Sequence, residues 1–201
     1  MRYLPIAIDS RKKSILIIGA GKSALIKLKT FLKSEFTITV LADHFLNDFD
    51  LLAIKYGNRL SLIKKRIDRD FNDFSFDFIV VSTNDIELNE HLAKRAKTFN
   101  IPILNTTNPD GSDFILNKIL NRSDISISVS SDAKAPGLSK YLADLLVEFL
   151  DDKDFEKIGL LVELRALLKE NHSKSIKEEM TRAYDMDKNE LRSYIKSFDE
   201  N

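Results

Sequence analysis

The sequence predicts an α/β protein in which a parallel sheet is followed by a small α+β region and a C-terminal helical module. Three observations lead to this fold class. Short apolar runs alternate with helical patterns over residues 1–113, as expected for a parallel sheet with helices on its faces. Residues 125–129 alternate isoleucine or valine with serine, which is typical of a strand covered on one side only. From Pro136 onward, apolar residues recur at helical spacing.

Five strands and three helices are predicted in the first half. Ile15–Ile18 is an unbroken apolar run, which marks a strand buried on both faces. β-branched residues predict the second strand, Thr37–Leu41, and the fourth has a nearly unbroken apolar centre. The other predicted strands are Leu60–Ile63, Phe76–Ser82 and Ile101–Leu104, and the predicted helices cover residues 24–32, 45–56 and 88–99.

The second half divides into residues 114–150, which hold the serine-alternating strand and the start of the helical part, and residues 151–201. The last predicted helix has a defined start: Asp187 is placed to cap it, Glu190 lies three residues on, and Met186 and Leu191 are placed to form a hydrophobic staple. Two apolar stripes predict the earlier helices: Leu138, Leu142, Leu145, Leu146 and Phe149, then Ile158, Leu161, Leu164, Leu167 and Leu168.

Composition excludes several classes of function. Lys+Arg and Asp+Glu are both 31, so a zero net charge argues against nucleic-acid binding. With no cysteine, the chain has no disulfide, thiolate nucleophile or cysteine zinc site, which is compatible with a cytoplasmic protein. The three histidines are isolated, so no fixed metal site is expected. The N-terminal segment predicts neither a signal peptide nor a membrane anchor.

A glycine-rich turn directly follows the first strand. Gly19-Ala20-Gly21-Lys22-Ser23-Ala24 has the form G-x-G-x-x-A between a buried strand and a helix, which is the setting of a dinucleotide-binding Rossmann domain. Gly19 permits the tight turn, Gly21 lets the backbone approach a pyrophosphate, and Ala24 lets the helix pack on the strand. The helix N-terminus then binds the anion. A purely structural turn is the alternative interpretation.

Asp43 follows the second strand, where such sites usually carry an acid that binds a ribose. It either contacts a ribose hydroxyl or caps the next helix. No arginine between Leu41 and Asp50 is available for a 2′-phosphate, so the expected cofactor is NAD rather than NADP.

In the order and spacing of several segments, the first 150 or so residues resemble the precorrin-2 dehydrogenase module of siroheme synthases. These segments are Leu4–Ile8, Gly19–Ala24 with Lys27 and Lys29, Ser82–Asp85 with Asn89, Asn105–Asn108, Phe114–Ile119 and Ser130–Pro136.

The resemblance implies an enzyme that oxidises precorrin-2, a tetrapyrrole with many carboxylates, to sirohydrochlorin with NAD⁺, and some members also insert iron. It implies a homodimer formed by residues 114–150, although a small edge strand within one monomer is the alternative for residues 125–129. Ser82, Thr83 and Asn105 would then lie at the cofactor and Ser131 at the substrate. Lys134 either meets substrate carboxylates or is solvated surface charge.

The sequence departs from this family at its catalytic acid. Asn108 stands where the family carries that acid, and an amide neither accepts nor donates a proton at neutral pH as a carboxylate does. Asp110 either takes over this role from a shifted backbone or is simply a turn residue of Asn-Pro-Asp-Gly. Two alternative functions therefore stay open: a chelatase or tetrapyrrole-binding protein without the redox step, and a non-enzymatic NAD-sensing module.

Overall fold

The computed structural model describes residues 1–122, 125–132, 134–151, 155–171 and 175–199. It forms two compact units, Met1–Leu116 and Asn117–Asn201. The predicted division at residues 113 and 150 into three regions is a finer one and stays a prediction.

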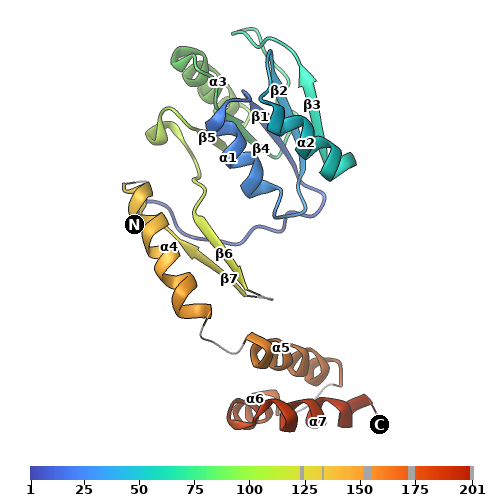
Figure 1. The fold of residues 1–201 in the computed structure, drawn as a ribbon. Helices are drawn as coiled ribbons and strands as arrows, with labels where there is room; N and C mark the ends of the chain where they lie inside the picture. The colour runs from blue at the N-terminus through green and yellow to red at the C-terminus, as the bar shows by residue number, and fades with distance from the viewer. Residues whose placement is uncertain (123–124, 133, 152–154, 172–174, 200–201) are drawn as a thin grey trace. The chain divides into compact units, whose positions relative to one another are not determined.

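A five-stranded parallel sheet in the order β3-β2-β1-β4-β5 forms the centre of the first unit (Figure 1). In the register, Ile18 lies beside Leu41 on one side and Val81 on the other. All five predicted strands are confirmed, with β4 and β5 starting two residues later than expected. The strands are β1 Ser14–Ile18, β2 Thr37–Ala42, β3 Leu60–Lys64, β4 Phe78–Val81 and β5 Ile103–Asn105.

Helices cover both faces of this sheet (Figure 1), because successive residues of each buried strand point to opposite sides. Ile15 and Ile17 pack with α1 and α2 in one core, whereas Leu16 and Ile18 pack with α3 in the other. The three predicted helices are confirmed as α1 Lys22–Phe31, α2 Asn47–Tyr56 and α3 Ile86–Thr98; two 3₁₀ turns, Gly57–Arg59 and Pro109–Gly111, complete the unit.

The second unit contains a hairpin of β6 Lys118–Arg122 and β7 Ile125–Val129, with Leu120 opposite Ile127. The alternation predicted for β7 is confirmed, since its serines are exposed and its other residues are half-buried. β6 was not predicted. Helix α4, Pro136–Asp151, packs on the hairpin with Ser139 and Ala143 buried.

Three further helices share a separate core in the second unit: α5 Phe155–Glu170, α6 Ile176–Asp185 and α7 Lys188–Asp199. The predicted start of α7 is confirmed. Asp187 Oδ1 accepts hydrogen bonds from the Asn189 and Glu190 amides at 2.7 and 2.9 Å, and Glu190 Oε2 accepts one from the Asp187 amide at 2.8 Å. Met186 and Leu191 both pack in this core, as expected of a staple.

Candidate dinucleotide-binding site

The glycine turn is held by backbone contacts to both neighbouring strands of β1. Gly19 N donates to Leu41 O and Ser82 N donates to Ile18 O, each at 2.8 Å. Gly19 has φ +103°, and a Cβ there would lie 2.7 Å from the Ser82 carbonyl carbon. Glycine is therefore required at this position, because a side chain would be strained and would overlap the backbone of Ser82, which directly follows β4.

The first turn of α1 has amides that no side chain caps. Gly21 is the N-cap residue, it makes no side-chain cap hydrogen bond, and the first turn contains no acid. The space where a Gly21 Cβ would point is open, with nothing within 4 Å. Ala24 is fully buried, as expected for close helix–strand packing. Free amides at a helix N-terminus form an anion site.

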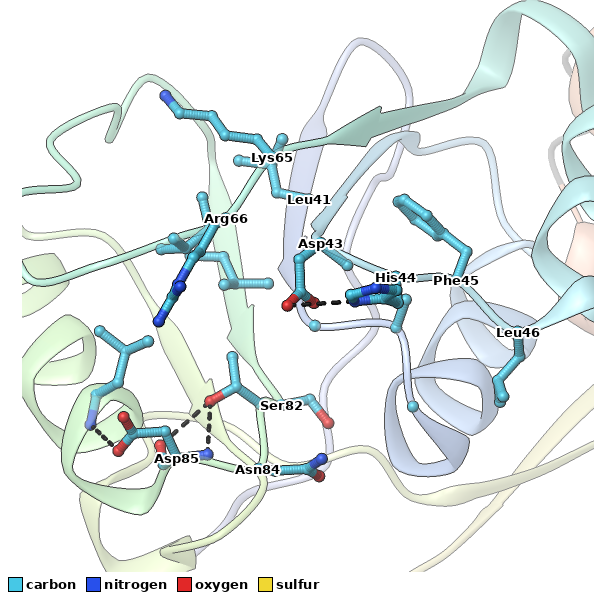
Figure 2. Close-up of a pocket in the computed structure, with 18 residues that line it drawn as sticks. Leu41, Asp43, His44, Phe45, Leu46, Lys65, Arg66, Ser82, Asn84 and Asp85 are labelled. Carbon is cyan, nitrogen blue, oxygen red and sulfur yellow. Dashed lines mark hydrogen bonds and ion pairs between the residues drawn. The ribbon is translucent and has the colours of Figure 1, made fainter.

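A pocket of about 530 Å³ opens beside this turn at the carboxyl ends of the strands (Figure 2). Four segments line it, which are residues 18–21, 41–46, 65–67 and 82–85, together with Leu88. Of the predicted cofactor residues, the pocket thus brings together Gly19, Ala20, Gly21, Asp43, Ser82 and Thr83. Lys22 and Ser23 are exposed, and they do not line the pocket, nor do Ala24 and Asn105.

Asp43 follows β2 directly and lines the pocket. It does not cap α2, whose N-cap residue is Leu46, so the structure removes the capping alternative. Its carboxylate lies 3.3 Å from His44 Nδ1 (Figure 2). The hydrogen bond to His44 holds the pKa of Asp43 below its usual range. The carboxylate is therefore ionised at neutral pH and available as a double acceptor for vicinal hydroxyls.

Lys65 and Arg66 also line the pocket, and sequence reasoning missed them. They follow β3, which lies beside β2 in the sheet. Both side chains are exposed. Arg66 forms no ion pair with any described residue. In Figure 2 the Lys65 side chain extends away from Asp43. The parallel strand order was the available signal, because it places the residues after β2 and β3 at one edge.

On the other side of the turn, the buried Asn89 organises a network of polar side chains. Its Oδ1 accepts from Thr83 Oγ1 at 2.7 Å, and its Nδ2 donates to Thr83 O at 3.0 Å and to Thr107 Oγ1 at 3.3 Å. Asn105 Oδ1 accepts from Thr107 Oγ1 at 2.8 Å, while Asn105 Nδ2 is buried without a partner among the described residues. The predicted residues Thr83 and Asn105 are thus joined through Asn89 and Thr107.

The two predicted catalytic residues lie in the loop after β5. Asn108 Nδ2 donates to Glu90 Oε1 at 3.4 Å. Asp110 lies in the 3₁₀ turn, its side chain is 87% exposed, and it pairs with Arg2. The Tyr3 hydroxyl also donates to Pro109 O at 2.9 Å, so the N-terminal segment is tied to this turn.

The two predicted substrate-binding residues belong to the second unit. Ser131 Oγ accepts from the Ala135 amide at 3.1 Å, just before α4. Lys134 is exposed, 4.0 Å from Asp132. Asp132 has φ +56°, a left-handed conformation that glycine adopts more readily. Ala133, the next residue, lies outside the described residues.

The residues that the structure describes include no group of three or more His, Cys, Asp or Glu side chains placed to hold a metal ion. They also include no helix with the length and apolar character needed to span a membrane.

The fold and the pocket define a dinucleotide-binding Rossmann domain. A family model described as "Putative NAD(P)-binding" matches residues 6–118, and the chain belongs to this NAD(P)-binding family. The expected cofactor, NAD, is one of the two cofactors, NAD and NADP, that the description of this family covers.

The relatives of the chain are siroheme synthases, which confirms the resemblance. The enzyme of Buchnera aphidicola is 29% identical over 161 residues, which are 79% of this chain and 33% of that protein. The enzyme of Vesicomyosocius okutanii is 33% identical over 145 residues, which are 71% of this chain and 30% of that protein. The chain therefore spans about a third of the length of these curated relatives.

A solved structure of SirC, a precorrin-2 dehydrogenase, has the same fold. It aligns with a TM-score of 0.76 at 22% identity and covers 98% of this chain and 100% of that chain.

The residues present fit NAD(P). Gly21 leaves open the space that a Cβ would fill, the α1 amides are free of side-chain caps, and Asp43 supplies a charged acceptor beside them. These are the groups that hold a diphosphate and a ribose in a Rossmann site.

Proposed function

We propose that this chain is a dehydrogenase that oxidises precorrin-2 to sirohydrochlorin with NAD⁺ in siroheme biosynthesis. The observation that carries the proposal is the uncapped N-terminus of α1 beside Asp43, in a pocket at the carboxyl edge of the sheet. The siroheme synthase relatives and the fold shared with a precorrin-2 dehydrogenase support the choice of substrate.

In this proposal the turn from Gly19 to Ala24 presents main-chain amides to the diphosphate. Asp43 accepts hydrogen bonds from the adenosine ribose, and its charge disfavours a 2′-phosphate, which supports NAD over NADP. When bound, NAD⁺ supplies the hydride acceptor. Ser82, Thr83 and Asn105 line or support the half of the site over β4 and β5, where Asn89 fixes Thr83 through three hydrogen bonds.

In the first unit, the proposed substrate-contacting loop is the one after β5, with Asn108 and Asp110. In the second unit, Ser131 and Lys134 stay proposed as contacts of substrate carboxylates, as the family resemblance implies. The Asn108 amide orients a neighbouring group but takes up no proton. Asp110 would have to leave Arg2 before it could act as a proton acceptor. Substitution of Asp110 by alanine tests this role, because unchanged turnover would remove Asp110 from the mechanism.

We propose a cytoplasmic homodimer as the working form. The resemblance to the siroheme synthase module supports it, and so does α4, where Leu138, Leu142, Leu145 and Phe149 are between 41% and 58% exposed. These side chains recur every three or four residues of α4, so they share one side of the helix. A contiguous exposed apolar surface of this kind marks an interaction site.

A second candidate function is a chelatase or tetrapyrrole-binding protein that lacks the redox step. The observation that favours it is Asn108, an amide that contacts a carboxylate instead of supplying one.

One anaerobic assay separates these functions. Protein is mixed with precorrin-2, with and without NAD⁺, while the visible spectrum is followed. Formation of sirohydrochlorin only with NAD⁺ supports the dehydrogenase. Metal-dependent spectral change of added sirohydrochlorin, with no effect of NAD⁺, supports the chelatase. Neither change, together with NAD⁺ binding measured by calorimetry, would leave a dinucleotide-sensing module and would sink the proposed activity.

A further inference from the structure

A carboxylate faces an amide where β5 leads into its loop. Glu90, on α3, accepts the 3.4 Å hydrogen bond from Asn108 Nδ2, and both residues are half-buried. Helix α3 begins just after β4, and the loop of Asn108 begins just after β5. Both therefore lie at the carboxyl edge of the parallel sheet, where ligands of such folds bind.

The pair adjoins the network that reaches the pocket. Asn89, the residue before Glu90, binds Thr83 on one side and Thr107 on the other, and Thr107 precedes Asn108. Since Thr83 lines the pocket, this network runs from the pocket wall to Asn89 and Thr107, the residues that directly precede Glu90 and Asn108 in the chain. Asn89 is fully buried, so the backbone on both sides of it is held in place.

The other two carboxylates near this loop are engaged elsewhere. Asp110 pairs with Arg2. Asp113 Oδ2 accepts from the Ile103 amide at 3.1 Å, and its Oδ1 lies 3.4 Å from Lys97 Nζ. Among the described residues Glu90 has no basic partner, and its one hydrogen bond is from the neutral amide. A carboxylate that no cation holds has oxygen atoms available to accept from a ligand.

We propose that Glu90 is the proton acceptor of the reaction and that Asn108 positions its carboxylate. This inference rests on the proposed dehydrogenase function. In the oxidation, precorrin-2 gives a hydride, with its two electrons, to NAD⁺ and one proton to a Glu90 carboxylate oxygen, and the proton then passes to water. The Asn108 amide holds the carboxylate and exchanges no proton. The proton acceptor therefore lies on α3, and the amide that positions it lies in the loop after β5.

The first test compares the wild type with Glu90→Gln. We expect kcat to fall about 100-fold, as for loss of a general base. The Kd for NAD⁺ should stay unchanged. The Kd for sirohydrochlorin, followed by fluorescence, should fall about threefold, because removing one negative charge near a polycarboxylate relieves charge repulsion. A purely structural role would weaken binding and lower the urea midpoint instead.

The matched control is Glu87→Gln, one turn earlier on α3. Glu87 is 81% exposed and pairs with Arg69, so this variant should keep the kcat and both Kd values of the wild type. A similar loss in both variants would overturn the proposal, and so would a Glu90→Gln protein whose kcat stays within threefold of wild type.

The double variant Glu90→Gln/Asn108→Asp exchanges the two groups and preserves a hydrogen bond between them. It should recover at least about tenfold of the kcat lost in Glu90→Gln, since a carboxylate returns to the same contact. Failure to recover any activity, with unchanged NAD⁺ affinity and urea midpoint, would contradict the claim that a carboxylate at this contact accepts the proton.

The two proposals fail separately. A wild-type protein that binds NAD⁺ but oxidises no precorrin-2 would refute the dehydrogenase function. The sirohydrochlorin titration then tests whether Glu90 lies beside the tetrapyrrole. Equal Kd values for wild type and Glu90→Gln would refute this position of Glu90, whereas a lower Kd for Glu90→Gln would support it.

Discussion

Gly19 and Gly21 have different roles two residues apart. Gly19 needs a positive φ and lies against the β4 backbone, whereas Gly21 has φ −83° and an open space where its Cβ would be. The first glycine therefore serves the fold, and the second serves the approach of a ligand to the backbone.

Alanine substitutions should separate these roles. Gly19→Ala should lower the free energy of unfolding by about 1–3 kcal/mol, because the new methyl group overlaps the Ser82 carbonyl. Gly21→Ala should leave stability within about 0.5 kcal/mol but weaken NAD⁺ binding strongly. Urea titration and calorimetry measure the two effects. Equal NAD⁺ affinity of Gly21→Ala and wild type would speak against the diphosphate site.

Asp77 ties the start of β4 to the start of β1. Its carboxylate accepts from Lys13 Nζ at 2.8 Å, the Ser14 amide at 2.9 Å and Ser14 Oγ at 3.0 Å. The hydrogen bond from Lys13, followed by that from the Ser14 amide, holds the pKa of Asp77 below its usual value. The ionised Asp77 carboxylate therefore stabilises the fold at pH values above the ordinary pKa of Asp, about 3.9. This stabilisation is lost as the pH falls through the lowered pKa of Asp77.

Asp77→Asn should therefore lower the free energy of unfolding at pH 7 by about 1 kcal/mol. This figure allows for solvent screening, because the Asp77 side chain is 34% exposed. The difference from wild type should shrink as the pH falls below about 4. Urea titrations at pH 7, 5 and 3 measure this trend. The control is Asp70→Asn, which changes an exposed carboxylate between β3 and β4 and should unfold like the wild type at all three pH values. A loss of stability in Asp77→Asn that is the same at every pH would contradict an ionic origin.

At the scale of the elements, α7 shows how much a local pattern determines. The Asp187–Glu190 box and the Met186–Leu191 staple are both read from six consecutive positions, and both form in the structure. The backbone amides of Glu190 and Asn189 lower the pKa of Asp187, so the cap carries a full charge at neutral pH. Such motifs are predictable because every partner lies within one helical turn.

Asp187→Ala should expose the first amides of α7, whereas Asp187→Asn keeps an acceptor oxygen at the cap. We expect faster hydrogen exchange of the Asn189 and Glu190 amides in the alanine variant and near wild-type exchange in the asparagine variant. Exchange followed by mass spectrometry or NMR gives the measurement. Equal protection in all three proteins would mean that the cap does not hold the helix start.

Strand β6 is the element that the sequence did not predict. Lys-Ile-Leu-Asn-Arg lacks a clear period of two, and only Leu120 is buried in it. It becomes a strand because it pairs with β7 and packs under α4. Pairing between strands is a tertiary contact, and propensity alone decides it poorly.

At the scale of the whole molecule, the exposed face of α4 bears on the oligomeric state. We expect the wild type to have about twice the 23.0 kDa mass of one chain in solution. Leu142→Glu places a charge in the middle of this apolar face and should give a monomer. Lys140→Glu, on the same helix, should stay dimeric. Sedimentation velocity measures all three, and a monomeric wild type would refute the homodimer.

The sequence by itself determined the parallel sheet, the glycine turn, the position of Asp43 after β2 and the cap of α7. These features follow from periodicity and turn chemistry, which act over a few neighbouring residues. It left open whether Asp43 binds a ribose or caps the next helix, and the fold removed capping because α2 begins at Asn47, with Leu46 as its N-cap.

Only the tertiary structure decided which distant side chains meet. It placed Lys65 and Arg66 in the pocket, paired Arg2 with Asp110, and brought Glu90 to Asn108. The partners in the two pairs are 108 and 18 residues apart in the chain. Such contacts depend on strand order and on the packing of α3 against the sheet, and no local pattern specifies either.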